Sequence, residues 1–391
     1  MNAGADIAGE TDLEQIREAV RALCSDFPGE YWRAKDRDSA YPQEFVTALT
    51  ESGFLACLIP EEYGGSGLDI THAGAILEEI HRAGCNGAAC HAQMYTMGTI
   101  LRHGNDEQKS RWLPKIANGE LRLQAFGVTE PTSGTDTLAL RTTAVKKGNK
   151  YIVNGQKVWT SRAEYSDLML LLARTTPADQ VEKRTDGLSV MVVDMQAAKN
   201  NGLTIRPLET MMNHSSCEVF FDDMEVPVEN LIGLEGKGFR YIIDGMNAER
   251  ILIAHECIGD GRWFVDRGTA YAKDRNVFGR PIGQNQGIQF PIARAYAHIE
   301  SSNLMVKEAA RKFDADEPCG PEANMSKMLA SEAAWEAAEM CVQTHGGFGF
   351  ATEYDVERKF RETRLYQVAP ISTNLILGYI GEHVLGLPRS Y

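Results

Sequence analysis

The sequence predicts a mainly α-helical protein with a β domain in its middle, in the order helical, β, helical. Residues 11–118 carry apolar residues at three- and four-residue spacing, which is typical of amphipathic helices. Short β-rich runs separated by turn residues follow, and long amphipathic patterns return after them. A chain of 391 residues is long enough for more than one core. We therefore expect domains at 1–120, 121–233 and 234–391.

The N-terminal region carries local signals for where its helices begin and end. The segments at 12–27 (DLEQIREAVRALCSDF) and 71–84 (THAGAILEEIHRAG) have amphipathic spacing. The segment at 41–54 (YPQEFVTALTESGF) opens with a proline suited to a first helical turn and ends near a glycine. The segment from 105 (NDEQKSRWLPKIANGEL) starts with Asn/Asp cap chemistry, and 60–69 (PEEYGGSGLD) is predicted to be a turn-rich connector.

The middle region is predicted to be all β over about 110 residues. Polar and apolar residues alternate in KYIVNG (150–155) and EVFFDDMEV (218–226), as expected for a sheet with one wet face. The pairs Gly148-Asn149 and Asn154-Gly155 are both hairpin signals.

The C-terminal region is predicted to be helical again. Residues 287–313, 321–345 and 371–387 supply long amphipathic patterns, which favour an antiparallel helical bundle.

Composition excludes several classes of function. The net charge of −14 argues against non-specific binding to nucleic acid or to an anionic membrane, because both need basic patches. The longest apolar run, at 168–173, is too short to cross a bilayer, and the N-terminal fifteen residues resemble neither a secretory signal nor a transit peptide. Eight scattered cysteines without a CxxC pair indicate reduced thiols and a cytoplasmic protein.

Common catalytic motifs are absent from the sequence. It contains no GxxxxGK[ST] loop, no GxGxxG after a strand and no GxSxG elbow. The nine histidines form no HExxH or comparable ligand spacing, so no metal site is expected.

Two segments of the β region could hold a planar ligand. In GVTEPTSGTDT (127–137), backbone N–H groups and the hydroxyls of Thr129 and Thr135 could grip a heteroaromatic edge or a phosphate, or the segment is only a decorated loop. In KVWTSR (157–162), Trp159 could lie against a planar cofactor while Ser161 bonds its edge. The alternative is a tryptophan buried in a β core.

Two segments of the C-terminal region add weaker signals. The paired glycines in QTHGGFGF (343–350) allow a ligand to approach the backbone closely. The stretch RNVFGRPIGQNQ (275–286) ends a helix at Arg275 and turns through Gly279 and Pro281.

Taken together, these motifs resemble the acyl-CoA dehydrogenase family over almost the whole chain. The likeness rests on PEEYGGSGL, GVTEPTSGTD, YIVNGQKVWTS, RNVFGRPIGQNQ and QTHGGFGF, in this order. It implies N-terminal helices, a middle β-barrel and a C-terminal four-helix bundle, with FAD held non-covalently between the barrel and the bundle. It also implies a homotetramer, an acyl-CoA substrate and an electron-transfer flavoprotein as acceptor.

The resemblance assigns site residues position by position. Phe126, Val128, Thr129 and Thr135 would line the flavin, Thr135 also facing substrate. Trp159 would pack on the isoalloxazine and Ser161 would bond near its N5. The remaining cofactor contacts would be Arg275, Phe278 and Gln286 on the FAD of a neighbouring subunit, Gln343, Gly346 and Gly347 near the adenosine and pyrophosphate, and Ser372 and Asn374 in place of the Thr and Gln that are more usual.

The usual catalytic base of the family is missing from LYQVAPISTN (365–374). The position of the family's glutamate falls on Pro370, which neither accepts a proton nor donates a backbone N–H. The family also uses that N–H on the thioester carbonyl, so we expect a ribityl hydroxyl of FAD, with the N–H of Ile371, to take this role.

A minority of the family carries the base on a helix, directly before an arginine that binds CoA. Glu249 precedes Arg250 at this place and shares a helical stripe with Leu252, Ile253 and Glu256, which predicts partial burial and a raised pKa. Arg250 and Asn247 would contact CoA. The alternative is an ordinary Glu–Arg pair on a helix surface.

Three hypotheses remain open from the sequence. The first is FAD-dependent α,β-dehydrogenation of an acyl-CoA with Glu249 as base. The second, motivated by Pro370, is a related flavoprotein with lyase- or desulfinase-like chemistry and no net oxidation. The third is a non-catalytic flavin-binding subunit.

Overall fold

The computed structural model describes residues 3–390, with the side chains of residues 12–390. The chain forms two compact units, each assembled from segments that are far apart in the sequence. The helical unit comprises Met1–Asp38, Asp69–Gly87 and Asn247–Tyr391. The sheet unit comprises Ser39–Leu68 and Ala88–Met246.

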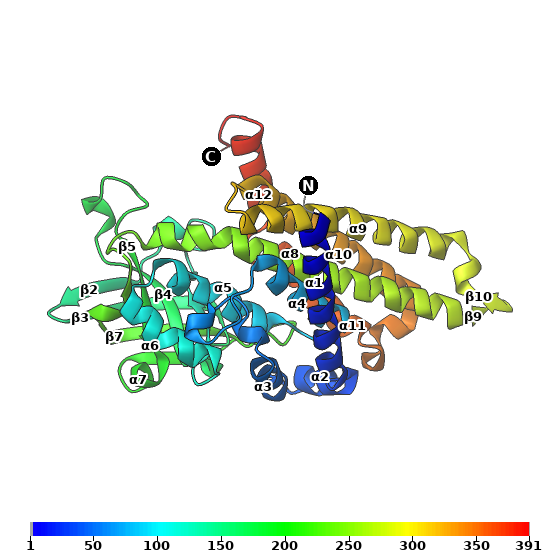
Figure 1. Ribbon diagram of the computed structural model, residues 1–391, viewed down its shortest axis with the longest axis horizontal. Coiled ribbons are helices and arrows are strands. Elements are labelled where there is room, and N and C mark those ends of the chain that lie inside the picture. The colour runs from blue at the N-terminus through cyan, green and yellow to red at the C-terminus, as the bar shows by residue number, and fades with distance from the viewer. Residues whose placement is uncertain (1–2, 391) are drawn as a thin grey trace. The chain divides into compact units, whose positions relative to one another are not determined.

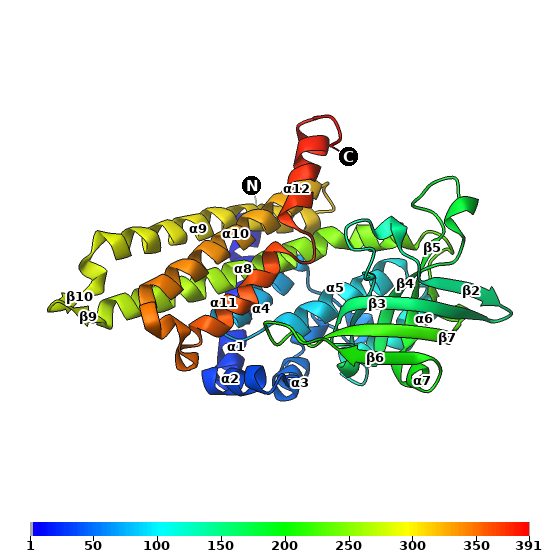
Figure 2. The ribbon, with the colours of Figure 1, turned by 180° about the vertical axis from the view of Figure 1, so that it is seen from behind.

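The helical unit is built mainly from long helices that run alongside one another (Figures 1 and 2). A two-stranded hairpin of β9 and β10 joins α8 to α9. The helix α8 begins within the sheet unit and continues into the helical unit. The elements are α1 (Ala3–Ser25), α2 (Gly29–Arg37), α4 (Ile70–Arg82), α8 (Gly238–Asp274), β9 (Asn276–Val277), β10 (Arg280–Pro281), α9 (Gln286–Asp314), α10 (Gly320–His345), α11 (Val356–Arg364) and α12 (Thr373–Tyr379).

Side chains of α8, α9 and α10 form the core of the helical unit. Ile253, Phe264 and Ile299 are buried against alanines of α10, of which Ala334 and Ala337 are fully buried. Small residues at these positions let the helices approach closely, as ridge-into-groove packing requires. The predicted C-terminal bundle is therefore confirmed.

Local capping signals predicted helix ends well. Asn105 and Gln108 form a reciprocal capping box at the start of α6, and α3 ends just before Gly53, which has φ of 77°. The first helix starts earlier than the sequence pattern indicated, at Ala3 instead of residue 11.

The sheet unit contains eight strands, four complete α-helices and the start of α8. The strand order is β6-β7-β3-β2-β4-β5-β8, and β1 adds to β4 in parallel. The elements are α3 (Gln43–Glu51), α5 (Ala88–His103), α6 (Asp106–Ala117), β1 (Leu123–Gly127), β2 (Thr143–Lys147), β3 (Lys150–Ser161), β4 (Leu168–Arg174), β5 (Leu188–Asp194), α7 (Met195–Lys199), β6 (Leu203–Pro207), β7 (Ser216–Pro227) and β8 (Leu231–Ile232).

Strand β4 explains the apolar run at 168–173. Leu168, Leu170 and Leu172 belong to a core that α5 and α6 share, whereas Met169 and Leu171 belong to the core on the other face. Because both faces of β4 are covered, every residue of the strand is buried and the sequence does not alternate.

One of the two predicted hairpins is correct. Gly148-Asn149 connects β2 to β3 as expected, with Val145 opposite Ile152. Asn154-Gly155 was wrong as a hairpin, because it lies inside β3, where the register against β7 shifts at a bulge. Gly155 has φ of 146°, and a Cβ there would lie 2.6 Å from the Thr142 hydroxyl. Glycine is therefore required at this bulge, just as it is favoured in a hairpin turn.

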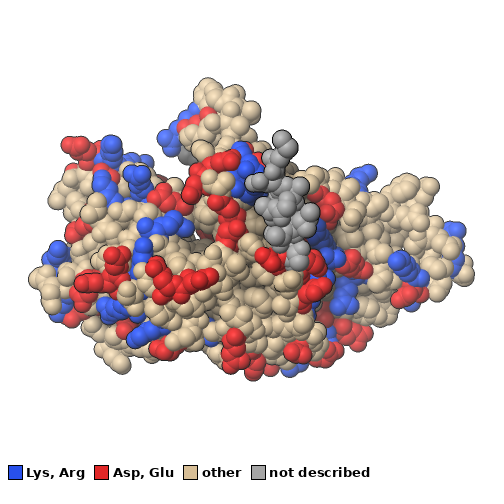
Figure 3. Space-filling view, viewed as in Figure 1, with Lys and Arg blue, Asp and Glu red and all other residues tan. Residues whose placement is uncertain are grey.

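Charged side chains of both signs lie on the face of the molecule that Figure 3 shows. Figure 3 shows acidic and basic side chains interspersed over the face in view, instead of a continuous basic stripe. Within residues 3–390, none of the helices combines the length and the apolarity that crossing a membrane requires.

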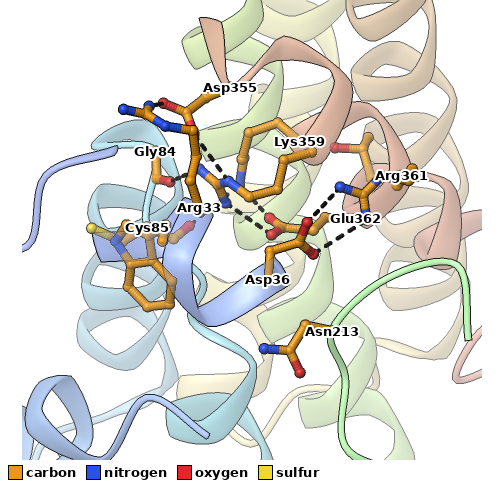
Figure 4. A network of polar contacts seen from close by, with 12 residues as sticks. Arg33, Asp36, Gly84, Cys85, Asn213, Asp355, Lys359, Arg361 and Glu362 are labelled. Atoms are coloured by element: carbon orange, nitrogen blue, oxygen red, sulfur yellow. Dashed lines mark hydrogen bonds and ion pairs between the residues drawn. The ribbon is translucent and has the colours of Figure 1, made fainter. Parts of the chain in front are cut away.

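Charged side chains buried in the helical unit form a connected network around α11 (Figure 4). Lys359 Nζ lies 2.5 Å from Asp260 Oδ1 and 3.3 Å from Glu362 Oε2. It also donates to the Cys85 carbonyl oxygen at 3.3 Å, and Thr363 Oγ1 donates to Asp260 Oδ2 at 2.8 Å. The network links α8 and α11 to the end of α4.

Candidate active site

The loop after β1 is fixed to strand β3 by a buried lysine. Lys157 Nζ donates to the Val128 carbonyl oxygen at 3.0 Å and to Glu130 Oε1 at 2.9 Å. The Val158 N–H donates to the Thr129 carbonyl oxygen at 2.9 Å. These bonds join the two segments that the sequence singled out as possible ligand contacts.

The pair of Lys157 and Glu130 was not predicted. Lys157 is fully buried, and burial lowers its pKa to about 8, although the charge of Glu130 opposes the shift. Burial also disfavours ionised Glu130, but Lys157 and the N–H groups of Arg141 and Thr142 outweigh it and lower the pKa of this carboxyl. The only sequence signal was a lysine at an inward position of a strand.

The aromatic ring of Trp159 is largely exposed to solvent. It is 60% exposed and has φ of 60°, and the register against β7 shifts between Lys157 and Thr160. The alternative of a tryptophan buried in a β core was therefore wrong. A bulge and a left-handed residue at one point of a strand are features that accompany functional sites.

The other predicted contacts of the sheet unit have different environments. The edge of the Phe126 ring packs on Tyr95, with 5.4 Å between the ring centroids. Ser161 is half-buried at the end of β3, and Thr135 is exposed. The arrangement offers an aromatic surface with hydroxyl groups nearby, which suits a planar ligand with polar edges.

Glu249 lies on α8 in the helical unit and is only 5% exposed. The stripe that it shares with Leu252, Ile253 and Glu256 is buried as predicted. A surface Glu–Arg pair is therefore excluded.

The guanidinium of the next residue, Arg250, has a hydrogen-bond partner for one of its N–H groups but not for its Nε. Its Nη1 donates to Asn247 Oδ1 at 3.0 Å, and Asn247 Nδ2 lies 3.8 Å from the Cys319 sulfur. Its Nε is buried and has no hydrogen-bond partner within the described chain. Burial lowers the pKa of Arg250, with Glu249 opposing. An orphaned guanidinium N–H beside a buried carboxylate is a natural place for a polar or anionic ligand group.

The segment 369–374 leads into α12, which begins at Thr373 and ends sooner than predicted, with a π turn at Ile380–Val384. Ser372 is the N-cap of α12, and its hydroxyl accepts from the Leu375 N–H at 3.4 Å. The Ile371 carbonyl oxygen accepts from Lys327 Nζ at 2.7 Å. Asn374 is exposed in the first turn of α12.

A third group of predicted residues lies at the end of α10 and around the β9–β10 hairpin. The Arg275 guanidinium lies over the Phe348 ring, 5.8 Å from its centroid. Phe278 is fully exposed, and Gln286 and Gln343 are exposed as well. A Cβ on Gly346 or Gly347 would meet no atom within 4 Å, so the backbone is open to a ligand, and Gly346 has φ of 59°.

The predicted residues thus fall into groups within each unit. In the sheet unit, one group joins the loop after β1 to β3. In the helical unit, Asn247, Glu249 and Arg250 lie together on α8, whereas the residues of 275–286 and 343–347 form a second place and the start of α12 a third.

A polar hollow of about 230 Å³ in the helical unit has a structural explanation. Arg17 pairs with Glu78 and Glu79 at 3.0 and 2.9 Å, and Arg262 pairs with Glu300 at 2.9 Å. Because its arginines already have carboxylate partners, the hollow needs no ligand. Its lining residues are Glu14, Arg17, Arg21, Glu79, Arg82, Arg262, Asn303 and Lys307.

The order of helices, sheet and helices, with an exposed tryptophan platform and a buried helix-borne carboxylate, defines a flavoprotein dehydrogenase class. Three family descriptions match the chain in that order: "Acyl-CoA dehydrogenase, N-terminal domain" at 10–120, "middle domain" at 125–224 and "C-terminal domain" at 236–385. The chain belongs to the acyl-CoA dehydrogenase family and is an oxidoreductase.

Relatives and solved structures match over nearly the full length. Acyl-CoA dehydrogenase FadE12 of Mycobacterium tuberculosis is 34% identical over 383 residues, covering 97% of this chain and 97% of the relative. The glutaryl-coenzyme A dehydrogenase structure with glutaryl-CoA matches with TM-score 0.89 at 30% identity, covering 97% of this chain and 96% of the other. A chain from work on the electron transferring flavoprotein of Acidaminococcus fermentans matches with TM-score 0.89 at 30% identity, covering 96% and 98%.

Proposed function

We propose that this protein performs FAD-dependent α,β-dehydrogenation of an acyl-CoA thioester, with Glu249 as the base. The observation that carries the proposal is the burial of Glu249 directly before Arg250 on α8, in a chain with proline where the family usually has its base. A base must lie in a site from which water is largely excluded and must reach the α-proton. Glu249 meets the first requirement, and its family position supports the second.

The residues present fit a flavin. Trp159 would stack on the ring system, and Phe126, Val128, Thr129, Thr135 and Ser161 would surround its polar edges. FAD, when bound, would accept the β-hydrogen of the substrate as hydride. Gln343, Gly346, Gly347, Ser372 and Asn374 would contact the remainder of the cofactor, and Arg275, Phe278 and Gln286 that of a neighbouring subunit.

The protein's own residues would bind and polarise the thioester. The open Nε of Arg250, with Asn247, is proposed to meet CoA, and Thr135 the acyl portion. Glu249 would take the α-proton and hold it. The Ile371 N–H donates to no other group in the described chain, so it is available to the thioester oxygen in place of the N–H that Pro370 lacks.

The test is a panel of straight, branched and cyclic acyl-CoAs mixed anaerobically with the purified protein. The expected result is bleaching of the flavin by at least one acyl-CoA, with a product lighter by two mass units. Turnover without that mass loss would support lyase- or desulfinase-like chemistry instead. A protein that cannot be reconstituted with FAD would support the non-catalytic alternative.

We also propose a homotetramer of three-domain subunits that passes electrons to an electron-transfer flavoprotein in the cytoplasm. Fully exposed Phe278, with Phe290 and Tyr296 more than half exposed, supports assembly through this part of the helical unit. The family matches at 10–120, 125–224 and 236–385 support domains at 1–120, 121–233 and 234–391. Eight buried cysteines, scattered along the sequence without a CxxC pair, support a reducing compartment.

Replacing Lys157 with methionine is expected to weaken FAD binding about tenfold, because the Val128 carbonyl and Glu130 lose a buried donor and the loop after β1 loosens. Quenching of flavin fluorescence on binding to the apoprotein measures the Kd. The matched control is Lys150→Met on the same strand, where the lysine pairs with Glu225 at the surface. Equal affinities for the two variants would contradict the assignment of the loop.

A further inference from the structure

Lys327, on α10, is the buried group that the proposed reaction leaves unexplained. Its side chain is fully buried, and the α10 residues near it in sequence, Ala323, Ser326, Ala330 and Ser331, are buried as well. Lysine is almost never fully buried without a partner, since removing an ammonium from water is costly. A residue kept at such a cost requires a reason.

The reason is not an ion pair. Within the described chain, no carboxylate lies within ion-pair distance of Lys327. Its ammonium instead donates to the carbonyl oxygen of Ile371 at 2.7 Å. Ile371 directly follows Pro370 and precedes Ser372, the N-cap of α12. Lys327 therefore ties α10 to the segment that carries the proposed thioester donor and two proposed FAD contacts.

The Lys327 ammonium also interacts electrostatically with Glu249, the proposed base. Burial lowers the pKa of Lys327 to about 8. Cys257 and Glu249 on α8 and Glu332 on α10 favour its charged form, whereas Arg250 on α8 disfavours it. Because electrostatic coupling is reciprocal, the ammonium of Lys327 in turn favours the ionised form of Glu249.

We propose that Lys327 is a positioning residue of the active site, which holds segment 369–372 through the Ile371 carbonyl and keeps Glu249 ionised as a base. The inference rests on the proposed function, because it assigns Lys327 a role toward Glu249 and the Ile371 N–H. A lysine can supply both effects from one position, since its ammonium is both a hydrogen-bond donor and a charge.

Two substitutions separate the two effects. Lys327→Met removes the donor and the charge, whereas Lys327→Gln keeps an N–H donor and removes only the charge. Lys307→Met, at an exposed lysine on α9, is the matched control for the loss of a lysine. If Lys327→Met does not yield folded holoenzyme, Lys327→Gln still tests the electrostatic part, because it has no charge to bury.

The first readout is amide hydrogen exchange of peptides covering residues 366–379, which needs no substrate. Exchange of this segment in Lys327→Met is expected to be at least tenfold faster than in the wild type, with peptides of the sheet unit unchanged. Lys327→Gln is expected to remain close to the wild type. Equal protection of this segment in Lys327→Met and the wild type would overturn the positioning role.

The second readout is the pH dependence of flavin reduction. A carboxylate that loses a neighbouring cation holds its proton more tightly. The acid limb of the rate profile is therefore expected to move upward by about one pH unit in both Lys327 variants, which is a tenfold rate loss on that limb, and to stay in place in Lys307→Met. An unmoved limb in both variants would refute the electrostatic role. A wild-type protein that no acyl-CoA reduces would instead refute the proposed function.

Discussion

Glu249→Gln is expected to slow flavin reduction by about 10²–10⁴-fold, the usual contribution of a positioned general base. Glutamine has nearly the same shape as glutamate, so the packing along Leu252 and Ile253 is retained. It cannot accept the α-proton. Binding of FAD and of acyl-CoA is expected to remain, because Trp159 and Arg250 are untouched. Anaerobic stopped-flow absorbance of the flavin measures the rate.

Two further variants make the assignment specific. Glu249→Asp keeps the carboxylate but withdraws it by one methylene, and is expected to retain a rate between those of the wild type and Glu249→Gln. Glu339→Gln, an exposed glutamate on α10, is the matched control and is expected to keep the wild-type rate. Wild-type bleaching by Glu249→Gln would end the assignment and return attention to the segment around Pro370.

The sequence predicted those features that depend on neighbouring residues. The capping box at Asn105, the glycine after α3 and the turn at Gly148-Asn149 are local, and the structure contains all three. Asn154-Gly155 shows the limit of such signals. The same dipeptide suits a two-residue turn and a bulge, and only the long pairing of β3 with β7 decides between them.

The candidate site likewise contains some features that local sequence predicts and others that depend on remote segments. The stripe of Glu249 predicted its burial, because helical periodicity reports which face turns inward. The sequence did not decide whether Trp159 is buried or exposed. Along a strand, side chains alternate between the two faces of the sheet, and a bulge interrupts this alternation. Lys157 and Lys327 were missed because each is held by a carbonyl from a remote segment, Val128 and Ile371 respectively. Sequence periodicity carries no information on such partners.

Acid is expected to unfold the helical unit through two buried carboxylates. Burial disfavours ionised Asp260, but the charges and hydrogen bonds of Lys359 and His81 outweigh it and hold its pKa at about 2, below the usual 3.8. Burial likewise disfavours ionised Glu78, but the His255 hydrogen bond and the charges of Arg17 and Arg262 outweigh it and hold its pKa at about 2, below the usual 4.5. Both carboxyls thus bind protons more weakly when folded.

The sign of the effect follows from linkage. A carboxyl whose pKa is lower in the folded state stabilises the fold fully above its unfolded pKa, and this contribution is lost as the pH falls toward the folded pKa. The window therefore runs from about pH 4.5 down to about pH 2. Together the two groups would contribute on the order of 5 kcal/mol, or roughly 10–20 °C in Tm. Calorimetry of the holoenzyme at fixed protein concentration between pH 7 and pH 2.5 measures the loss.

Asp260→Asn tests whether this network is the source. At pH 7 it removes the Asp260 anion 2.5 Å from Lys359 and leaves Glu362 at 3.3 Å as the remaining partner, which is expected to cost about 3 kcal/mol. Below pH 4 the variant should lose Tm less steeply than the wild type, because one of the two titrating groups is gone. Glu308→Gln, which removes an exposed pair with Arg311, should leave both the Tm and its pH slope nearly unchanged. Parallel curves for Asp260→Asn and the wild type would place the acid sensitivity outside this network.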